Sequence, residues 1–368
     1  MTDLLVGTRK GLFEVRRARG AYEVGEPSFL AVPVTALLHD GRDGTTYAGL
    51  DHGHYGIKLH RREPGATAWT ELDAPAYPPK PEGTTDVDPN RRDEVPWTTL
   101  LIWSIEAAHP DRPGALWAGT IPGGLFRSSD RGDSWELVRS LWDEPSRAEW
   151  FGGGYDHPGM HSVSVDPRSA DTVLVGVSCG GAWRTDDEGK SWSAATGMRA
   201  AFMPPEQAYN PVVQDPHRLA RCAAAPDVIW CQHHNGVFRS TDGGASFEEI
   251  TDIQPSTFGF GVAAHPGDRD TAWLAPAIAD EARVPVDGRL VVTRTRDGGQ
   301  TWEALGRGLP DHDAYHLIYR HALAVDASGE RLAMGSTTGS LWVSEDAGDS
   351  WDLVSPDLPP IACVRWAE

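Results

Sequence analysis

The chain has 368 residues, with 53 acidic and 33 basic side chains and a formal net charge of −20 at pH 7. This acidic surplus argues against binding to the phosphate backbone of nucleic acids. No apolar run approaches the roughly 18–20 residues that cross a bilayer, and no signal peptide precedes the first apolar run. We therefore expect a cytoplasmic protein with neither a nucleic acid nor a membrane as its partner.

Short apolar runs alternate with glycine-containing turns along the whole chain. In chain order these units cover about 3–28, 33–73, 100–139, 160–197, 217–251, 257–305 and 318–355, and a last apolar run covers 360–367. Five units contain one octapeptide, Ser/Thr-x-Asp-x-Gly-x-Ser/Thr-aromatic, beginning at residues 128, 185, 240, 295 and 344. Subtraction gives steps of 57, 55, 55 and 49 residues. Such regular spacing is typical of a repeat architecture.

The octapeptide predicts a tight turn between two strands. Its Asp and the flanking Ser or Thr can hydrogen-bond the backbone of their own turn, and its Gly supplies a positive φ without a steric clash. The closing Trp or Phe is a large apolar group that packs beneath the turn. We therefore assign the five aspartates a structural role rather than a catalytic one.

Each unit accommodates four short strands, with the octapeptide between the third and the fourth. We predict an all-β fold, a seven-bladed β-propeller of four-stranded antiparallel blades, formed by residues 1–368 as a single domain. The split closing blade takes three strands from 3–28 and its innermost strand from 360–367. Joining the two ends in one blade closes the ring and leaves no open sheet edge. Six or eight blades is the alternative if the degenerate unit 33–73 is misassigned.

The octapeptide is the Asp-box, and the chain resembles the sialidase-type BNR/Asp-box repeat proteins over essentially its whole length. It is most similar to bacterial cytoplasmic proteins labelled WD40/YVTN/BNR-like or "glycosyl hydrolase". The segments that carry this resemblance are Val6–Phe13, His234–Ser240, Phe258–Phe260, Arg283 ahead of Asp287, and Arg320. The resemblance implies the propeller fold and the place of the site, but no substrate. Sialidases are six-bladed and use three arginines, and other Asp-box relatives are receptors or assembly factors without chemistry.

The long insertions all map to one face of the predicted ring, which we call the loop face; the octapeptides map to the opposite, turn face. The insertions cover about 74–99, 140–160, 198–216, 276–288 and 305–317. Loops of this length in a compact domain are usually functional or disordered. Most of the fourteen histidines map to the same face. We therefore expect the functional site there.

Three of these histidines are predicted to converge. His161 and His217 begin the innermost strands of adjacent blades, and His234 lies in a loop of the second blade. Neutral imidazoles around one ion suit a divalent transition metal, and the same groups can serve as general acid or base. The alternative is a hydrogen-bonded polar rim without a ligand.

Cations and aromatic side chains also gather at the loop face. Converging guanidinium groups suit a carboxylate, sulfate or phosphate, whereas the alternative is ion pairing with Asp280, Glu281 or Asp313. Cys179 is a further candidate, as a nucleophile, although no local signature supports it. The predicted acid/base groups are Glu106 and Asp280. The predicted substrate-binding residues are Arg9, Lys10, Arg283, Arg320, Tyr55, Tyr319, Phe258 and Phe260.

Three functions remain open on this evidence. The first is an enzyme of hydrolase or lyase type that binds a small anionic substrate. The second is a non-catalytic scaffold for a protein or peptide, which requires an exposed apolar patch made by Tyr77, Trp97, Trp142, Trp150, Phe151 and Tyr155. The third is glycoside hydrolysis, which requires Glu106 and Asp280 to face each other about 5–10 Å apart.

Overall fold

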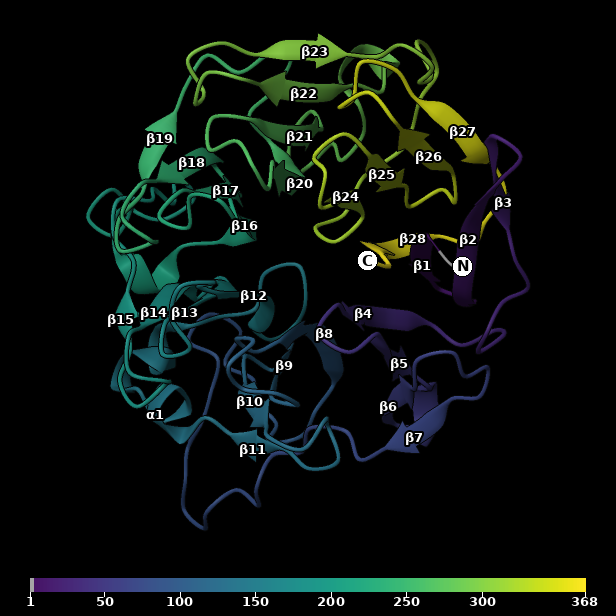
Figure 1. The fold of residues 1–368 in the computed structure, drawn as a ribbon. Helices are drawn as coiled ribbons and strands as arrows, with labels where there is room; N and C mark the ends of the chain where they lie inside the picture. The colour runs from purple at the N-terminus through teal and green to yellow at the C-terminus, as the bar shows by residue number, and fades with distance from the viewer. Residues whose placement is uncertain (1–2) are drawn as a thin grey trace.

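The computed structural model describes residues 3–368, in which seven four-stranded antiparallel sheets form a ring (Figure 1). The predicted all-β, seven-bladed β-propeller is therefore confirmed. Helices are few and short in the described chain: α1 (Arg139–Trp142) and 3₁₀ helices at Gly53–Tyr55, Pro145–Glu149, Pro211–Val213 and Val286–Gly288. No helix within residues 3–368 is long and apolar enough to span a membrane.

The first four blades follow the predicted units, and their strands are given from the innermost outward. Blade 1 contains β28 (Ile361–Trp366), β1 (Leu4–Thr8), β2 (Gly11–Ala18) and β3 (Ala21–Val24). Blade 2 contains β4 (Val34–Asp40), β5 (Thr45–Asp51), β6 (Ile57–Arg62) and β7 (Thr70–Leu72). Blade 3 contains β8 (Leu101–Ala107), β9 (Leu116–Ile121), β10 (Leu125–Ser128) and β11 (Glu136–Leu137). Blade 4 contains β12 (Gly159–Val165), β13 (Val173–Ser178), β14 (Gly181–Thr185) and β15 (Ser193–Ala194).

The remaining three blades repeat the same order. Blade 5 contains β16 (Pro216–Arg221), β17 (Ile229–His233), β18 (Gly236–Ser240) and β19 (Glu248–Ile250). Blade 6 contains β20 (Gly259–Ala264), β21 (Ala272–Pro276), β22 (Val292–Thr295) and β23 (Glu303–Leu305). Blade 7 contains β24 (Leu323–Val325), β25 (Leu332–Gly335), β26 (Leu341–Ser344) and β27 (Asp352–Ser355).

The ring closes in blade 1, where the two ends of the chain lie side by side (Figure 1). Strand β28 pairs antiparallel with β1, so that Leu4 faces Trp366 and Gly7 faces Cys363. A Cβ at Gly7 would lie 2.5 Å from Cys363 Sγ, which explains why this position has no side chain. The predicted split blade is confirmed.

The five octapeptide turns share one set of hydrogen bonds. In the β10–β11 turn, Ser128 Oγ donates to Asp130 Oδ1 (2.7 Å) and accepts from the backbone N–H of Gly132 (2.9 Å). The same Asp130 oxygen accepts from the backbone N–H of Ser134 (2.9 Å). These bonds recur in the turns that begin at Thr185, Ser240, Thr295 and Ser344. The aspartates are thus engaged by their own turns, as the sequence predicts.

The blades pack through apolar side chains of their middle strands. Trp117, Val175 and Trp183, from blades 3 and 4, belong to one buried cluster, and Trp273 and Trp342, from blades 6 and 7, belong to another. The innermost strands surround a central channel whose cavity measures about 550 Å³. This packing holds the ends of the innermost strands in place at the loop face.

The long connections match the predicted insertions. They run from β7 to β8, β11 to β12, β15 to β16, β21 to β22 and β23 to β24. Antiparallel order places each connection on the face opposite the octapeptide turns, because chain direction reverses with every strand. The loop face is therefore built from segments of five different blade connections.

Candidate functional site

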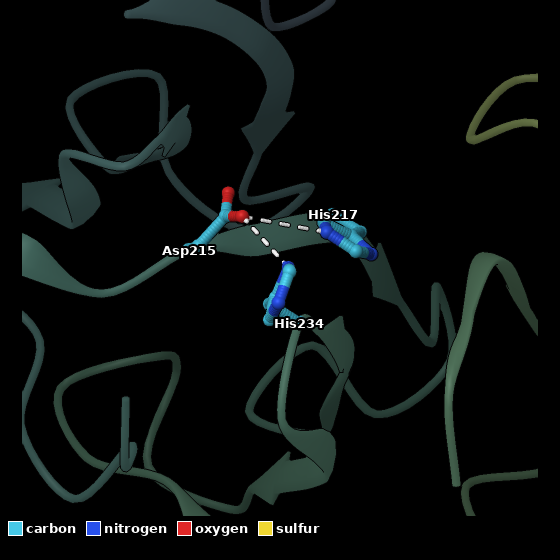
Figure 2. A group of neighbouring side chains, drawn as sticks. All are labelled: Asp215, His217 and His234. Atoms are coloured by element: carbon cyan, nitrogen blue, oxygen red, sulfur yellow. Dashed lines mark ion pairs between the residues drawn. The ribbon is translucent and has the colours of Figure 1, made fainter. Parts of the chain in front are cut away.

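A buried carboxylate and two imidazoles meet at the loop face of blade 5 (Figure 2). Asp215 precedes β16, His217 lies in β16, and His234 follows β17. Asp215 Oδ2 lies 3.4 Å from His217 Nε2 and 3.4 Å from His234 Nδ1. Figure 2 shows one carboxylate oxygen directed at both rings. The side chain of His234 is 21 % exposed, so this group is reached by solvent from the His234 side.

Asp215 is fixed as an anion by its surroundings. Its Oδ1 accepts hydrogen bonds from Ser178 Oγ (3.1 Å) and from the backbone N–H of Cys179 (3.1 Å). Burial would raise the pKa of Asp215, but the His217 and His234 imidazoles, with the Arg320 charge, hold it well below its ordinary value. The carboxylate therefore presents a charged Oδ2 to the two imidazoles.

The two imidazoles are held by an aromatic frame. His217 stacks on Phe260 with ring centroids 4.3 Å apart and an interplanar angle of 13°. The ring of Phe258 meets both His217 and His234 edge-on. The predicted role of Phe258 and Phe260 in substrate binding stays a prediction, and both rings contact His217 in the structure.

Arg320 is the cation of this site. Its guanidinium carbon lies 4.8 Å from the Trp103 ring centroid and 5.1 Å from that of Phe260. The residue is 8 % exposed, and within residues 3–368 its guanidinium has no hydrogen bond or ion pair. Burial lowers the pKa of Arg320, and the nearby Asp215 carboxylate partly offsets this effect. Burying a guanidinium without such a partner is energetically costly.

His161 does not join the other two histidines, contrary to the prediction of a three-imidazole metal site. It is fully buried beside Trp103, and its Nδ1 contacts Ser162 Oγ (2.9 Å). Within residues 3–368, the group able to hold a metal consists of Asp215, His217 and His234. His161 and His217 occupy the same bulged position of β12 and β16, but the His161 ring packs against Trp103, and the third member of the group is Asp215.

The other predicted cations are more exposed. Arg283 pairs with Asp280, as the ion-pairing alternative anticipates, and its guanidinium lies 5.3 Å from the Phe260 centroid. Arg9 and Lys10 are exposed in the β1–β2 loop. The charge of Arg9 reaches Tyr155, which packs edge-on against Trp103 at 5.0 Å. Arg9 therefore lies at the rim of the site, and Arg320 lies inside it.

The predicted tyrosines differ in position. Tyr319 is half-buried and packs edge-on against Phe260 at 5.7 Å, so it lies in the site. Tyr55 is 67 % exposed and contacts His52 and His54. It lies on the β5–β6 loop, and none of its ring contacts involves the Asp215 group.

Glu106 and Asp280 do not face each other, so the predicted carboxylate pair for glycoside hydrolysis is wrong. Glu106 lies near the end of β8, lines the central channel and pairs with Arg365 at 2.5 Å. Asp280 lies in the β21–β22 loop and is engaged by Arg283. Because β8 runs away from the loop face, its last residues lie deep in the channel, near the turn face.

The predicted nucleophile Cys179 is also corrected. Burial raises the pKa of its thiol well above the ordinary value, and the Asp215 carboxylate raises it further. A thiol held in its protonated form is a poor nucleophile. Cys179 instead contributes its backbone N–H to Asp215.

The exposed apolar patch required by the protein-binding hypothesis is not found. Tyr77, Trp142, Trp150 and Phe151 are buried and pack within the long loops, and Trp97 is half-buried. Tyr155 is the member with substantial exposure, at 48 %. These four buried aromatic residues therefore belong to the core of the long loops and offer no binding surface.

Sequence reasoning missed Asp215 and Trp103. Asp215 precedes His217 by two positions. Alternate residues of a strand point to the same side, and this spacing was the one signal in the sequence that could have identified Asp215. Trp103 lies on β8, two blades away from β16, and nothing in the sequence links it to Arg320.

Comparisons with known proteins give relatives of the same fold. No protein-family model matches the chain. It is 25 % identical over 273 residues to a probable oligoxyloglucan-reducing end-specific xyloglucanase of Neosartorya fischeri, covering 67 % of this chain and 31 % of that protein. A xyloglucanase of Hypocrea jecorina is also 25 % identical, over 283 residues that cover 67 % of this chain and 32 % of that one. The chain thus spans about a third of the length of these curated relatives.

Solved structures agree with the propeller fold. An ancestral GH74 enzyme superimposes with a TM-score of 0.59 at 14 % identity, covering 100 % of this chain and 40 % of that one. YCF48 from Cyanidioschyzon merolae superimposes with a TM-score of 0.57 at 16 % identity, covering 93 % and 90 %. At these identities the likeness defines the architecture of the chain, a β-propeller, and not its activity.

Proposed function

We propose that the protein is a hydrolase acting on a small anionic substrate bound at the loop face of the propeller. The observation that carries this proposal is Arg320, whose guanidinium is buried between Trp103 and Phe260 and has no hydrogen bond or ion pair within residues 3–368. An anionic group of the substrate is the partner that the site lacks. The similarity to xyloglucanases supports the hydrolase class, although the names of these relatives specify xyloglucan and not a small anion.

From the geometry we assign each of these residues a separate role. Arg320 holds the anion, while Asp215, His217 and His234 act on the water molecule that attacks the substrate. His234 is the group among these three that meets solvent, and its Nδ1 faces the Asp215 carboxylate at 3.4 Å. A carboxylate behind an imidazole orients the ring and stabilises its protonated form. An elimination at the same site would use the same groups and differ in its products.

Two other functions receive less support. A protein- or peptide-binding scaffold needs exposed apolar area, and of the six aromatic residues proposed for it only Tyr155 is substantially exposed. Glycoside hydrolysis needs two facing carboxylates, and Glu106 is paired with Arg365 in the channel. The buried cation and the adjacent imidazoles favour a small anion.

The test is a hydrolysis screen over phosphate, sulfate and carboxylate esters and lactones bearing an acidic group. We expect turnover by the wild type and at least a hundred-fold loss in His234→Ala, with the melting temperature changed little. His54→Ala, which removes an exposed histidine of the same face, is the matched control and retains activity. Incorporation of solvent oxygen into the product separates hydrolysis from elimination. Equal rates in His234→Ala and the wild type would reject the proposal.

A further inference from the structure

We infer that Asp215 Oδ2, His217 Nε2 and His234 Nδ1 bind one divalent first-row transition metal of the zinc type. This inference deepens the proposed function, because it names what would activate the water molecule. It rests on four features of the site: the spacing of the three atoms, the orientation of His217, the hydrogen bonds behind the ligands, and the access of solvent. Each feature is independent of any substrate.

The spacing fits coordination better than direct hydrogen bonding. All three candidate ligand atoms lie within 4.8 Å of one another, and the carboxylate oxygen is 3.4 Å from each nitrogen. Metal–ligand bonds of about 2.0–2.2 Å in a tetrahedron place neighbouring ligand atoms roughly 3.3–3.5 Å apart. An N–H···O hydrogen bond would instead be about 2.7–3.2 Å long. The oxygen therefore stands at the separation that a shared ion imposes.

The orientation of His217 presents its second ring nitrogen to the site. His217 Nδ1 lies 2.7 Å from the carbonyl oxygen of Gly259 and donates a hydrogen bond to it. His217 Nε2 is therefore the nitrogen that faces Asp215 Oδ2, 3.4 Å away. An ion between these two atoms would accept one ligand bond from each.

The groups behind the ligands complete a metal site. A ligating histidine usually donates its other N–H to a backbone carbonyl, as His217 does to Gly259. The second oxygen of Asp215 accepts from Ser178 Oγ and the Cys179 N–H, which fixes the carboxylate. The Phe260 ring, stacked on His217, fixes the plane of that imidazole. The donor atoms are therefore held in place before any ion arrives.

The donor set defines the class of metal and the chemistry. Two imidazoles and one carboxylate suit zinc and its neighbours rather than Ca²⁺ or Mg²⁺, which prefer all-oxygen sites. Three protein ligands leave a position open, and solvent reaches the group from the His234 side. Such an ion activates a bound water molecule and polarises a substrate oxygen. Together with Arg320, it would make the pocket a strong receptor for anions.

The experiment is metal analysis of the full chain, tag-free and purified without chelator, by elemental mass spectrometry, followed by titration of the apoprotein with Zn²⁺ and Co²⁺. We expect about one equivalent of metal in the wild type and less than a tenth of that in His217→Ala and His234→Ala. His161→Ala and His54→Ala are the matched controls and retain the full equivalent. His234 is partly exposed, so the His234→Ala protein folds even if His217→Ala does not.

Each result decides the inference. A wild-type protein that stays metal-free after incubation with Zn²⁺, Co²⁺ and Mn²⁺ would overturn it, and so would metal retained in His234→Ala. Metal lost in His161→Ala as well as in His234→Ala would also overturn this ligand set. A bound metal without turnover on the anionic panel would reject the proposed function alone. Turnover that survives complete metal removal would reject the metal site alone.

Discussion

The guanidinium carbon of Arg320 lies 4.8 Å from the centre of the Trp103 ring, across the channel mouth from its own blade. Trp103 belongs to β8 of blade 3, whereas Arg320 precedes β24 of blade 7. A buried cation stacked on aromatic rings gains cation–π energy of about 2 kcal/mol but lacks the hydrogen bonds that it makes in water. This contact is the basis of our proposal that Arg320 binds an anion.

The first prediction concerns the stability of Arg320→Met. We expect its free energy of unfolding to fall by no more than about 2 kcal/mol, because the substitution removes the cation–π contacts but, within residues 3–368, no hydrogen bond or ion pair. The matched control is Arg294→Met. Arg294 is 2 % exposed, pairs with Asp349 at 2.7 Å and donates to the Ala347 carbonyl (2.8 Å). Its loss should cost about 3–5 kcal/mol in chemical denaturation. Equal losses in the two variants would contradict the unpaired state of Arg320.

The second prediction concerns Asp280, which sequence analysis nominates as an acid/base group. In the structure Asp280 Oδ1 accepts from Arg283 Nε at 3.0 Å. Asp280→Asn should therefore keep its turnover and bind anions roughly two- to five-fold more tightly, since an exposed ion pair is worth about 0.2–1 kcal/mol and its removal frees Arg283. Steady-state kinetics would measure both the turnover and the apparent affinity. A complete loss of turnover would instead support a catalytic role for Asp280.

The third prediction concerns acid stability of the octapeptide turns. Hydrogen bonds from Ser191 and Thr185 lower the pKa of Asp187 to about 2, below the value of about 3.9 in an unfolded chain. The stabilisation of the folded state by ionised Asp187 is therefore present above about pH 4 and is lost as the pH falls towards 2. Asp187→Asn should lower the melting temperature at pH 7, and the difference from wild type should shrink between pH 4 and pH 2. The exposed Glu206→Gln serves as the control, and a pH-independent difference for Asp187→Asn would exclude this cause.

The fourth prediction concerns the closure of the ring. Gly7→Ala would place a Cβ 2.5 Å from Cys363 Sγ and should destabilise the protein by about 1–3 kcal/mol. Cys363→Ala removes that sulfur, so the double variant should recover much of the loss. Denaturant unfolding of the four proteins gives the coupling energy. Additive effects would show that the β1–β28 register is not as described.

The fold was predictable because it is encoded locally and repeatedly. Each octapeptide specifies its own turn through its Ser or Thr, its Asp and its Gly, and five such turns at regular spacing define the blades. The split blade followed from the unit at 3–28, which lacks an innermost strand. These features depend on residues that are close together in the sequence, so they can be predicted without a structure.

The site was only partly predictable because its contacts join distant blades. His217 and His234 were found, since both lie at strand ends of blade 5. His161 was misplaced because its ring packs against Trp103 of blade 3, a contact between blades that sequence spacing does not reveal. Glu106 was misplaced because it lies near the end of β8 that is far from the loop face, where it pairs with Arg365. The pairing of Arg320 with Trp103 depends on the curvature of the whole ring.

The most direct test of the account is anion binding by Arg320, measured by isothermal titration calorimetry with inorganic phosphate, sulfate and acetate. The wild type should show one saturable site for at least one of these anions. Arg320→Met should weaken it by roughly 10- to 100-fold, because a hydrogen bond to a charged group is worth about 1.5–3 kcal/mol. Arg296→Met, on the turn face, should bind as the wild type does. Anion binding of equal strength in Arg320→Met would contradict the proposed site.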